Sequence, residues 1–248
     1  MEGNAKSSAG IRLPCGELEA VILQGAIFDC DGLLADTETP DYEAWRQIYE
    51  EQGLHLPIAH WAQNIGVAKG HDLADWHAPL AERVGPGYDR DATQTRRHAH
   101  YQAAIAALTP MPGITELLDA LAWAGIPCAV ASNSERAWVD NVLAVSGLAN
   151  RFAAIATADE VPNAKPAPDV YLLAASRLGV PPEACVAFED SPRGLAAAHA
   201  AGMFTVAVPT VLTNHFDFVQ AHHRTSSLEG MTPNRLNALM EYAYRSKD

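Results

Sequence analysis

The stretch GAIFDCDGLLADTE, from Gly25 to Glu38, places two aspartates directly after a short apolar run. An apolar run closed by Asp and Gly is typical of a buried strand followed by a turn, which predicts a strand over 25–28. Asp29 and Asp31 would then lie at nearly the same point, where their like charges repel. A cation between the carboxylates would relieve this repulsion, while two solvated acids at an ordinary strand end are the structural alternative.

The second half of the chain repeats the strand pattern. From Thr109 onward, helical segments alternate with short apolar runs, which is the signature of a parallel sheet with crossover helices. Strands are predicted at 127–132, 153–157, 184–190 and 203–208, and helices at 117–124, 135–146, 169–178 and 192–202. The predicted fold class is therefore α/β, with a doubly wound, mostly parallel sheet.

Residues 38–108 have a different character. Their apolar residues follow helical spacing over 42–53, 71–85 and 95–108, and each segment closes at a Gly or a Thr-Pro break. We therefore expect a helical cap domain at 38–108, inserted into a core formed by 20–37 and 109–248. Residues 1–19 are expected to be a flexible leader, because they lack the apolar segment of a signal peptide.

Composition narrows the function classes. Hydrophobic residues make up 48% and charged residues 19% of the 248, as in folded proteins. The formal net charge of -13 disfavours binding to nucleic acid or to an anionic membrane, so a phosphate would have to be held locally. No apolar run is long enough to span a bilayer, and the four cysteines form no CxxC motif. A soluble, cytoplasmic protein with structural cysteines is expected.

Polar side chains follow the predicted strands of the core. Parallel sheets of this kind bind ligands at the carboxyl ends of their strands, so we expect these side chains to converge on one edge. Besides the two aspartates, the residues at those ends are Ser132, Asn133, Ser134, Glu189, Asp190 and Ser191, with Lys165 in a neighbouring loop.

This set of residues suits phosphoryl transfer. Asp29 can act as a nucleophile that forms an aspartyl phosphate, and Asp31 can protonate the leaving oxygen and later deprotonate water. Carboxylates around one point suit Mg²⁺. The metal and Lys165 would offset charge on the phosphoryl group, while Ser132 and backbone N–H groups would hold its oxygens.

Four motifs in this order, DCDGLLADTE, ASNS, AKPAPD and FEDSPRG, resemble the haloacid dehalogenase superfamily and its β-phosphoglucomutase-like group. The similarity runs from Gly25 to about Val208 and implies a Rossmann-like core with a helical cap. It also implies roles. Asp29 would be the nucleophile and a metal ligand, and Asp31 would be the acid/base, with its main-chain carbonyl touching the metal. Ser132 and Asn133 would bind the phosphate, and Lys165 would bridge the phosphate and the nucleophile. Asp190 would bind the metal directly, and Glu189 would bind it directly or through water.

Some polar residues have a structural interpretation. Ser134 and Ser191 are predicted to cap helices, and Asp169 to begin one. The ten histidines form no convincing metal cluster, and His222 and His223 are expected to lie in a polar loop. The peptide bond before Pro166 is often cis in similar proteins.

The cap is where members of the family differ. The loop of the cap that reaches the cleft aligns by pattern with residues 65–72, IGVAKGHD. Lys69 is therefore a candidate contact to substrate oxygens or to a second phosphate. The alternative is that Lys69 is a solvated surface lysine. Sugar-phosphate mutases of this group usually carry His where this chain has Asp41. Dehalogenases and phosphonatases are disfavoured because Asp31 is present.

The sequence therefore predicts a Mg²⁺-dependent phosphatase that hydrolyses a small phosphate monoester, such as a sugar phosphate. The alternatives are a β-phosphoglucomutase-type mutase, a non-enzymatic phospho-acceptor and a catalytically inactive scaffold. The expected partner is a small phosphorylated metabolite, with no nucleic acid and no membrane, and the protein is expected to be a monomer or a small homo-oligomer. The sequence gives no functional account of residues 213–231 beyond a connection to a C-terminal helix.

Overall fold

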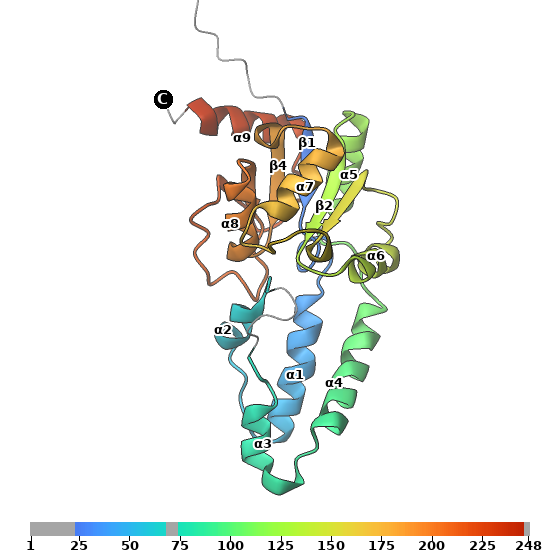
Figure 1. Cartoon of the computed structure of the whole chain (residues 1–248), viewed down its shortest axis with the longest axis vertical. Helices are drawn as coiled ribbons and strands as arrows, with labels where there is room; N and C mark the ends of the chain where they lie inside the picture. Colours follow the sequence, from blue (N-terminus) through green and yellow to red (C-terminus); the bar gives the residue numbers. More distant parts are fainter. Residues whose placement is uncertain (1–22, 68–73, 246–248) are drawn as a thin grey trace, which may run out of the picture.

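Six strands form one parallel sheet in the computed structural model, which describes residues 23–67 and 74–245 (Figure 1). Their order is β3-β2-β1-β4-β5-β6, and each neighbouring pair is parallel. The strands are β1 Gly25–Phe28, β2 Cys128–Ser132, β3 Ala154–Thr157, β4 Cys185–Glu189, β5 Phe204–Ala207 and β6 His223–Arg224. The predicted α/β class is confirmed, and the chain order reverses at β1, where such sheets bind ligands.

Helices cover both faces of the sheet because its side chains alternate. Phe28 and Val130 point to one face, where they pack with α5, α6 and α9, while Ile27 and Ala129 point to the other and pack with α7 and α8. These helices are α5 Ile114–Trp123, α6 Arg136–Val145, α7 Asp169–Leu178, α8 Pro192–Ala200 and α9 Pro233–Arg245.

Four further helices come before α5 in the sequence and lie together beyond the carboxyl edge of the sheet (Figure 1). They are α1 Glu38–Glu51, α2 Ile58–Trp61, α3 Ala78–Val84 and α4 Arg90–Ile105, and we call them the cap helices. Their shared core is aromatic, with Tyr42, Trp45, Tyr49 and Trp61 buried together. The long helices α1 and α4 run side by side, so residues from both face the sheet edge.

Two predictions about local structure are wrong. His223, which was expected to lie in a polar loop, instead forms the edge strand β6 with Arg224, and Leu228 in the same segment is buried in the core. Ser134 does not cap α6; Glu135 occupies that position, and the Ser134 hydroxyl bonds elsewhere. The two-residue strand was missed because its sequence, HR, is polar.

Other local predictions hold. Ser191 caps α8 by accepting a hydrogen bond from Gly194 N, and α7 begins at Asp169. The peptide bond before Pro166 is cis. Cys30, Cys128 and Cys185 are buried and free, whereas Cys15 and the predicted leader lie outside the described residues. Among the helices of the described ranges, none has the length and apolarity needed to cross a membrane.

Candidate active site

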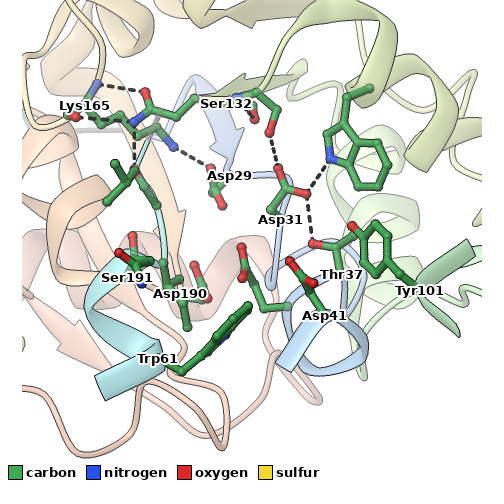
Figure 2. A pocket seen from close by; sticks show the side chains of 18 of the residues that line it. Asp29, Asp31, Thr37, Asp41, Trp61, Tyr101, Ser132, Lys165, Asp190 and Ser191 are labelled. Atoms are coloured by element: carbon green, nitrogen blue, oxygen red, sulfur yellow. Dashed lines mark hydrogen bonds and ion pairs between the residues drawn. The ribbon is translucent and has the colours of Figure 1, made fainter. Parts of the chain in front are cut away.

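A cavity of about 480 Å³ lies between the carboxyl edge of the sheet and the cap helices (Figure 2). The sheet edge and the loops that follow it line one side, and helices α1 and α4 with the loop at 64–67 line the other. Pockets of this size hold small metabolites. Six of the residues predicted to act in catalysis, phosphate binding or metal binding line this cavity: Asp29, Asp31, Ser132, Asn133, Lys165 and Asp190.

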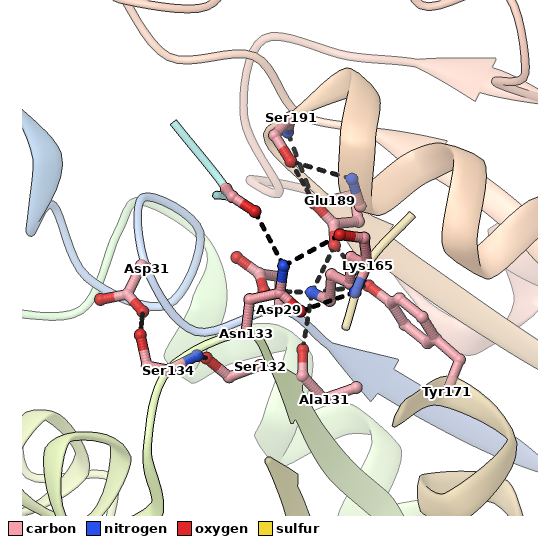
Figure 3. A network of polar contacts seen from close by, with 12 residues as sticks. Asp29, Asp31, Ala131, Ser132, Asn133, Ser134, Lys165, Tyr171, Glu189 and Ser191 are labelled. Atoms are coloured by element: carbon pink, nitrogen blue, oxygen red, sulfur yellow. Dashed lines mark hydrogen bonds and ion pairs between the residues drawn. The ribbon is translucent and has the colours of Figure 1, made fainter. Parts of the chain in front are cut away.

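Lys165 joins two carboxylates inside the core (Figure 3). Its Nζ lies 2.5 Å from Asp29 Oδ1 and 2.7 Å from Glu189 Oε1, and it also donates to the Ala131 carbonyl oxygen at 2.8 Å. Burial would lower the pKa of Lys165, but the two carboxylates outweigh it and raise the pKa above its usual value. Lys165 therefore stays protonated beside Asp29.

The acidic cluster has the composition of a site for a hard cation. Asp29, Glu189 and Asp190 each offer an oxygen within 4.8 Å of the others, and Asp190 Oδ2 is buried without a hydrogen-bond partner among the described residues. Burial and the neighbouring Glu189 raise the pKa of Asp29 to about 8, although Lys165 opposes the shift. Burial and Asp29 raise the pKa of Asp190 as well. One ammonium group does not balance three carboxylates, so a divalent cation fits the cluster.

Two glycines allow the carboxylates to come this close. Gly32 has a φ of +79°, and a Cβ there would lie 2.4 Å from Asp190 Oδ2. At Gly194 in α8, a Cβ would lie 1.8 Å from Glu189 Oε1. Both glycines are part of the quoted motifs, and the close packing explains why a side chain does not fit at either position.

Asp31 is held by three donors on the other side of Asp29 (Figure 2). Thr37 Oγ1 and Trp138 Nε1 donate to its Oδ1 at 2.8 and 2.7 Å, and Ser134 Oγ donates to its Oδ2 at 2.7 Å. Sequence reasoning missed Trp138 and Thr37 as contacts. The spacing of four residues between Ser134 and Trp138, at the start of a helix, is the signal that could have found the tryptophan.

Asn133 connects the two sides of the cavity. Its Nδ2 donates to the carbonyl oxygen of Gly66, in the loop from the cap, at 2.8 Å, and its Oδ1 accepts from Lys165 N at 2.8 Å. Ser132 Oγ accepts from Ser134 N at 3.0 Å. The side chain of Asn133 is therefore engaged with protein, which leaves its backbone N–H as the group that can contact phosphate.

Tyr171 is a further residue of the core that sequence reasoning missed. Its hydroxyl donates to Glu189 Oε1 at 2.6 Å, and the hydroxyl of Ser191 lies 3.2 Å from Glu189 Oε2. These donors orient Glu189 toward Lys165. No motif names Tyr171, although it lies on the first turn of the helix that follows the AKPAPD motif.

The cap side of the cavity carries acidic groups. Asp41 forms an ion pair with Arg97, whose guanidinium lies over the ring of Tyr101. Burial, with Asp31 and Asp41 nearby, raises the pKa of Glu38 well above its usual value. Lys69, which was predicted to contact substrate, lies outside the described residues.

The chain is also similar to known proteins. The family described as haloacid dehalogenase-like hydrolase matches residues 23–202. A curated relative, "Putative phosphatase YhcW" of Bacillus subtilis, is 38% identical over 210 residues, which cover 85% of this chain and 94% of that protein.

Two solved structures share the fold. β-Phosphoglucomutase from Clostridium difficile matches with a TM-score of 0.69 at 24% identity, over 90% of this chain and 100% of that one, which shows the fold alone. A mutant of CbbY from Rhodobacter sphaeroides, solved with xylulose-(1,5)bisphosphate, matches with a TM-score of 0.64 at 26% identity, over 85% of this chain and 96% of that one.

Proposed function

The chain belongs to the haloacid dehalogenase-like hydrolases, and we propose that it is a Mg²⁺-dependent phosphatase that hydrolyses a small sugar phosphate or a similar monoester. The observation that carries the proposal is the position of Asp29, which Lys165 contacts at 2.5 Å while Asp31 lines the same cavity. One carboxylate is thus held as a nucleophile beside a cation, and a second is available to move a proton.

Asp29 attacks phosphorus through a carboxylate oxygen, the bond to the leaving oxygen breaks, and an aspartyl phosphate forms. Lys165 favours the ionised form of Asp29, because it opposes the rise in the pKa of that carboxyl group, and it lies where it offsets charge on the phosphoryl oxygens. Ser132 and the backbone N–H of Asn133 hold those oxygens. Water then attacks the aspartyl phosphate at phosphorus, the bond between phosphorus and the Asp29 oxygen breaks, and inorganic phosphate leaves with Asp29 restored as a carboxylate.

Asp31 gives its proton to the leaving oxygen in the first step and takes one from water in the second. The Asp31 carboxylate accepts hydrogen bonds from three donors, but protonated Asp31 has an O–H group that needs an acceptor. The hydroxyls of Thr37 and Ser134 can turn to accept, whereas Trp138 can only donate. The surroundings of Asp31 therefore accommodate both of its protonation states.

Mg²⁺ would be held by Asp29, by Asp190 and by the main-chain carbonyl of Asp31. Glu189 would contact it directly or through water. The metal, when bound, would supply positive charge to the phosphoryl oxygens. Two observations support this assignment: Asp190 Oδ2 has no hydrogen-bond partner in the described part of the chain, and three buried carboxylates crowd together there.

The mutase alternative is less well supported. Asp41 stands where those mutases usually carry His, and it is paired with Arg97. Neither member of this pair is an imidazole, which is the side chain that those mutases usually carry at this position. Sugar phosphates with one or two phosphates are the candidate substrates, since the relative CbbY was solved with a bisphosphate.

The test is phosphate release from a panel of sugar phosphates, measured with Mg²⁺ and after chelation by EDTA. We expect turnover with Mg²⁺, loss with EDTA, recovery when Mg²⁺ is restored, and no turnover in Asp29→Asn. Asp119→Asn, which changes an exposed carboxylate paired with Arg151, is the matched control and should retain activity. Activity that survives chelation or persists in Asp29→Asn would contradict the mechanism, and isomerisation without phosphate release would indicate a mutase.

A further inference from the structure

One indole ring contacts both the core side and the cap side of the cavity. Trp138, on α6 of the core, donates a hydrogen bond from its Nε1 to Asp31 Oδ1 at 2.7 Å. The same ring stacks on Tyr101 of cap helix α4, with ring centroids 6.0 Å apart and an angle of 18° between the ring planes. Trp138 and Tyr101 both line the cavity, so this connection lies beside the space that would hold the leaving group.

The cap holds the ring of Tyr101 in place. Arg97, one turn earlier on α4, has its guanidinium carbon 4.9 Å from the centroid of that ring. Arg97 is itself anchored by its ion pair with Asp41 on α1, and the two side chains are 15% and 24% exposed. A continuous series of contacts therefore runs from α1 and α4 of the cap, through the two aromatic rings, to Asp31.

The indole is the rigid member of the three groups that hold Asp31. Thr37 and Ser134 donate through hydroxyls, which rotate about the C–O bond, whereas the N–H of Trp138 is fixed in the plane of its ring. The stack on Tyr101 restricts how that ring can turn. The direction of the bond from the indole to Asp31 thus depends on a contact between the core and the cap.

The bond from Trp138 also affects which oxygen of Asp31 can present a proton to a substrate. Oδ1 accepts from Thr37 and Trp138, which occupy both of its lone pairs. Oδ2 accepts from Ser134, and no other described residue donates to it. A proton on Oδ1 would take the place of one of these bonds and would face Thr37 or Trp138 instead of a substrate. These contacts leave Oδ2 as the oxygen with room for the proton.

We infer that Trp138 and Tyr101 are positioning residues for the leaving-group proton: Tyr101 fixes the indole, and the indole holds Asp31 so that Oδ2 gives its proton to the leaving oxygen. This inference rests on the proposed function and assigns part of the positioning of its acid/base to the cap. Neither aromatic residue lies in the four motifs. The alternative is that both rings only pack the cap against the core, which predicts equal losses for every substrate when a ring is changed.

The experiment compares two substrates of similar shape that need the proton to different degrees. Phenoxide is a stronger base than 4-nitrophenoxide, so phenyl phosphate depends more on protonation of its leaving oxygen than 4-nitrophenyl phosphate does. The constant to measure is kcat/KM, with the full chain and Mg²⁺, because it reports the steps up to departure of the leaving group. Asp31→Asn should lower kcat/KM of phenyl phosphate by about 10²-fold and that of 4-nitrophenyl phosphate much less.

Trp138→Phe keeps an aromatic ring beside Tyr101 but removes the N–H donor. We expect it to lower kcat/KM of phenyl phosphate by about tenfold and to change that of 4-nitrophenyl phosphate by less than about twofold. Trp123→Phe is the matched control, because Trp123 on α5 is 93% exposed and does not line the cavity. Equal losses with both substrates in Trp138→Phe, or no loss with either, would overturn the inference.

Tyr101→Leu removes the ring that stacks on the indole and leaves the N–H donor present. It should shift the ratio of the two constants in the same direction as Trp138→Phe, by about threefold, and should add no shift when combined with Trp138→Phe or with Asp31→Asn. Tyr101→Phe keeps the ring and should keep the wild-type ratio. A ratio that Tyr101→Leu leaves unchanged, or a shift that persists together with Asp31→Asn, would show that the cap does not act through Asp31.

Asp31→Asn separates failure of this inference from failure of the proposed function. If Asp31→Asn slowed both aryl phosphates equally, Asp31 would not be the acid, and the proposed mechanism would fail. If Asp31→Asn were selective but Trp138→Phe and Tyr101→Leu were not, the mechanism would stand and the inference would be wrong. Urea unfolding shows whether each variant is folded, and if Trp138→Phe is not, the comparison of Tyr101→Leu with Tyr101→Phe decides. If neither aryl phosphate is hydrolysed, the best sugar phosphate of the panel and acetyl phosphate, whose acetate leaves without a proton, take their places.

Discussion

Ser134 donates a hydrogen bond to Asp31 across 103 positions of sequence, with its Oγ 2.7 Å from Asp31 Oδ2. The serine follows β2, and the aspartate follows β1, the neighbouring strand. The hydroxyl that sequence reasoning assigned to a helix cap thus positions the proposed acid/base.

Ser134→Ala should lower kcat by about tenfold, because Asp31 loses the hydroxyl that can both donate and accept. KM should change little, and the free energy of unfolding should fall by about 1 kcal/mol. Steady-state kinetics and urea unfolding measure both effects. Ser146→Ala is the control, since this hydroxyl bonds to Val142 O within α6 and its loss should affect stability alone. Ser134→Ala is also combined with Asp31→Asn. If Ser134→Ala lowered kcat of the Asp31→Asn variant by the same factor as it lowers kcat of the wild type, the contact with Asp31 would not explain the effect.

Asn133 is predicted to hold the loop from the cap against the core. Asn133→Ala removes the bonds to Gly66 and Lys165 and should raise KM several-fold, because the wall near the phosphate loosens. Asn133→Asp should be more damaging than Asn133→Ala, because its carboxylate would face the carbonyl oxygens of Gly66 and Lys165. Kinetics with a monophosphate check this order, and equal activity of the two variants would contradict it.

Gly194→Ala should inactivate the enzyme although the residue touches no substrate. Alanine usually stabilises a helix relative to glycine, but here its Cβ would meet Glu189 Oε1 at 1.8 Å. Glu189 would have to move away from Lys165, and we expect a stability loss of about 1–3 kcal/mol together with loss of turnover. Gly87→Ala is the control, because a Cβ at that position would meet no atom of the described residues within 4 Å. Normal turnover in Gly194→Ala would show that the position of Glu189 is not needed.

The sequence was enough to predict the sheet and the core residues of the site. Each strand from β1 to β4 is an apolar run closed by a polar residue, so its end marks both the strand and the edge where ligands bind. This pattern places Asp29 and Asp190 near one another before any coordinates are known, whereas Lys165 lies in a loop and is identified by its motif.

The remaining contacts depend on tertiary packing, which periodicity does not encode. Ser134 looks like a cap residue because a helix follows it, but Asp31 competes for its hydroxyl. Tyr171 and Arg97 lie on helices with no distinctive local pattern, and they reach the site only because α7 packs on the sheet and α4 runs beside α1. The strand β6 is defined by its pairing with β5 rather than by its own residues.

Away from the site, Glu160 predicts how stability depends on pH. It pairs with Arg177 at 2.8 Å and accepts a hydrogen bond from Thr157 N, and the bond from Arg177 is the main reason that its pKa falls from 4.5 to about 2. Because the folded pKa is depressed, this stabilisation is present above pH 4.5 and is lost as the pH falls toward 2.

Glu160→Gln should therefore reduce the free energy of unfolding near pH 7 by about 1 kcal/mol, a value discounted for the partial exposure of the pair. The difference between the wild type and the variant should shrink between about pH 4.5 and pH 3, because the wild type then binds the proton that the variant lacks. Urea unfolding across this pH range measures the difference in the free energy of unfolding. Adding Arg177→Gln to the wild type and to Glu160→Gln separates the contribution of the ion pair. A difference that stayed constant down to about pH 3 would show that the charge of Glu160 does not stabilise the fold.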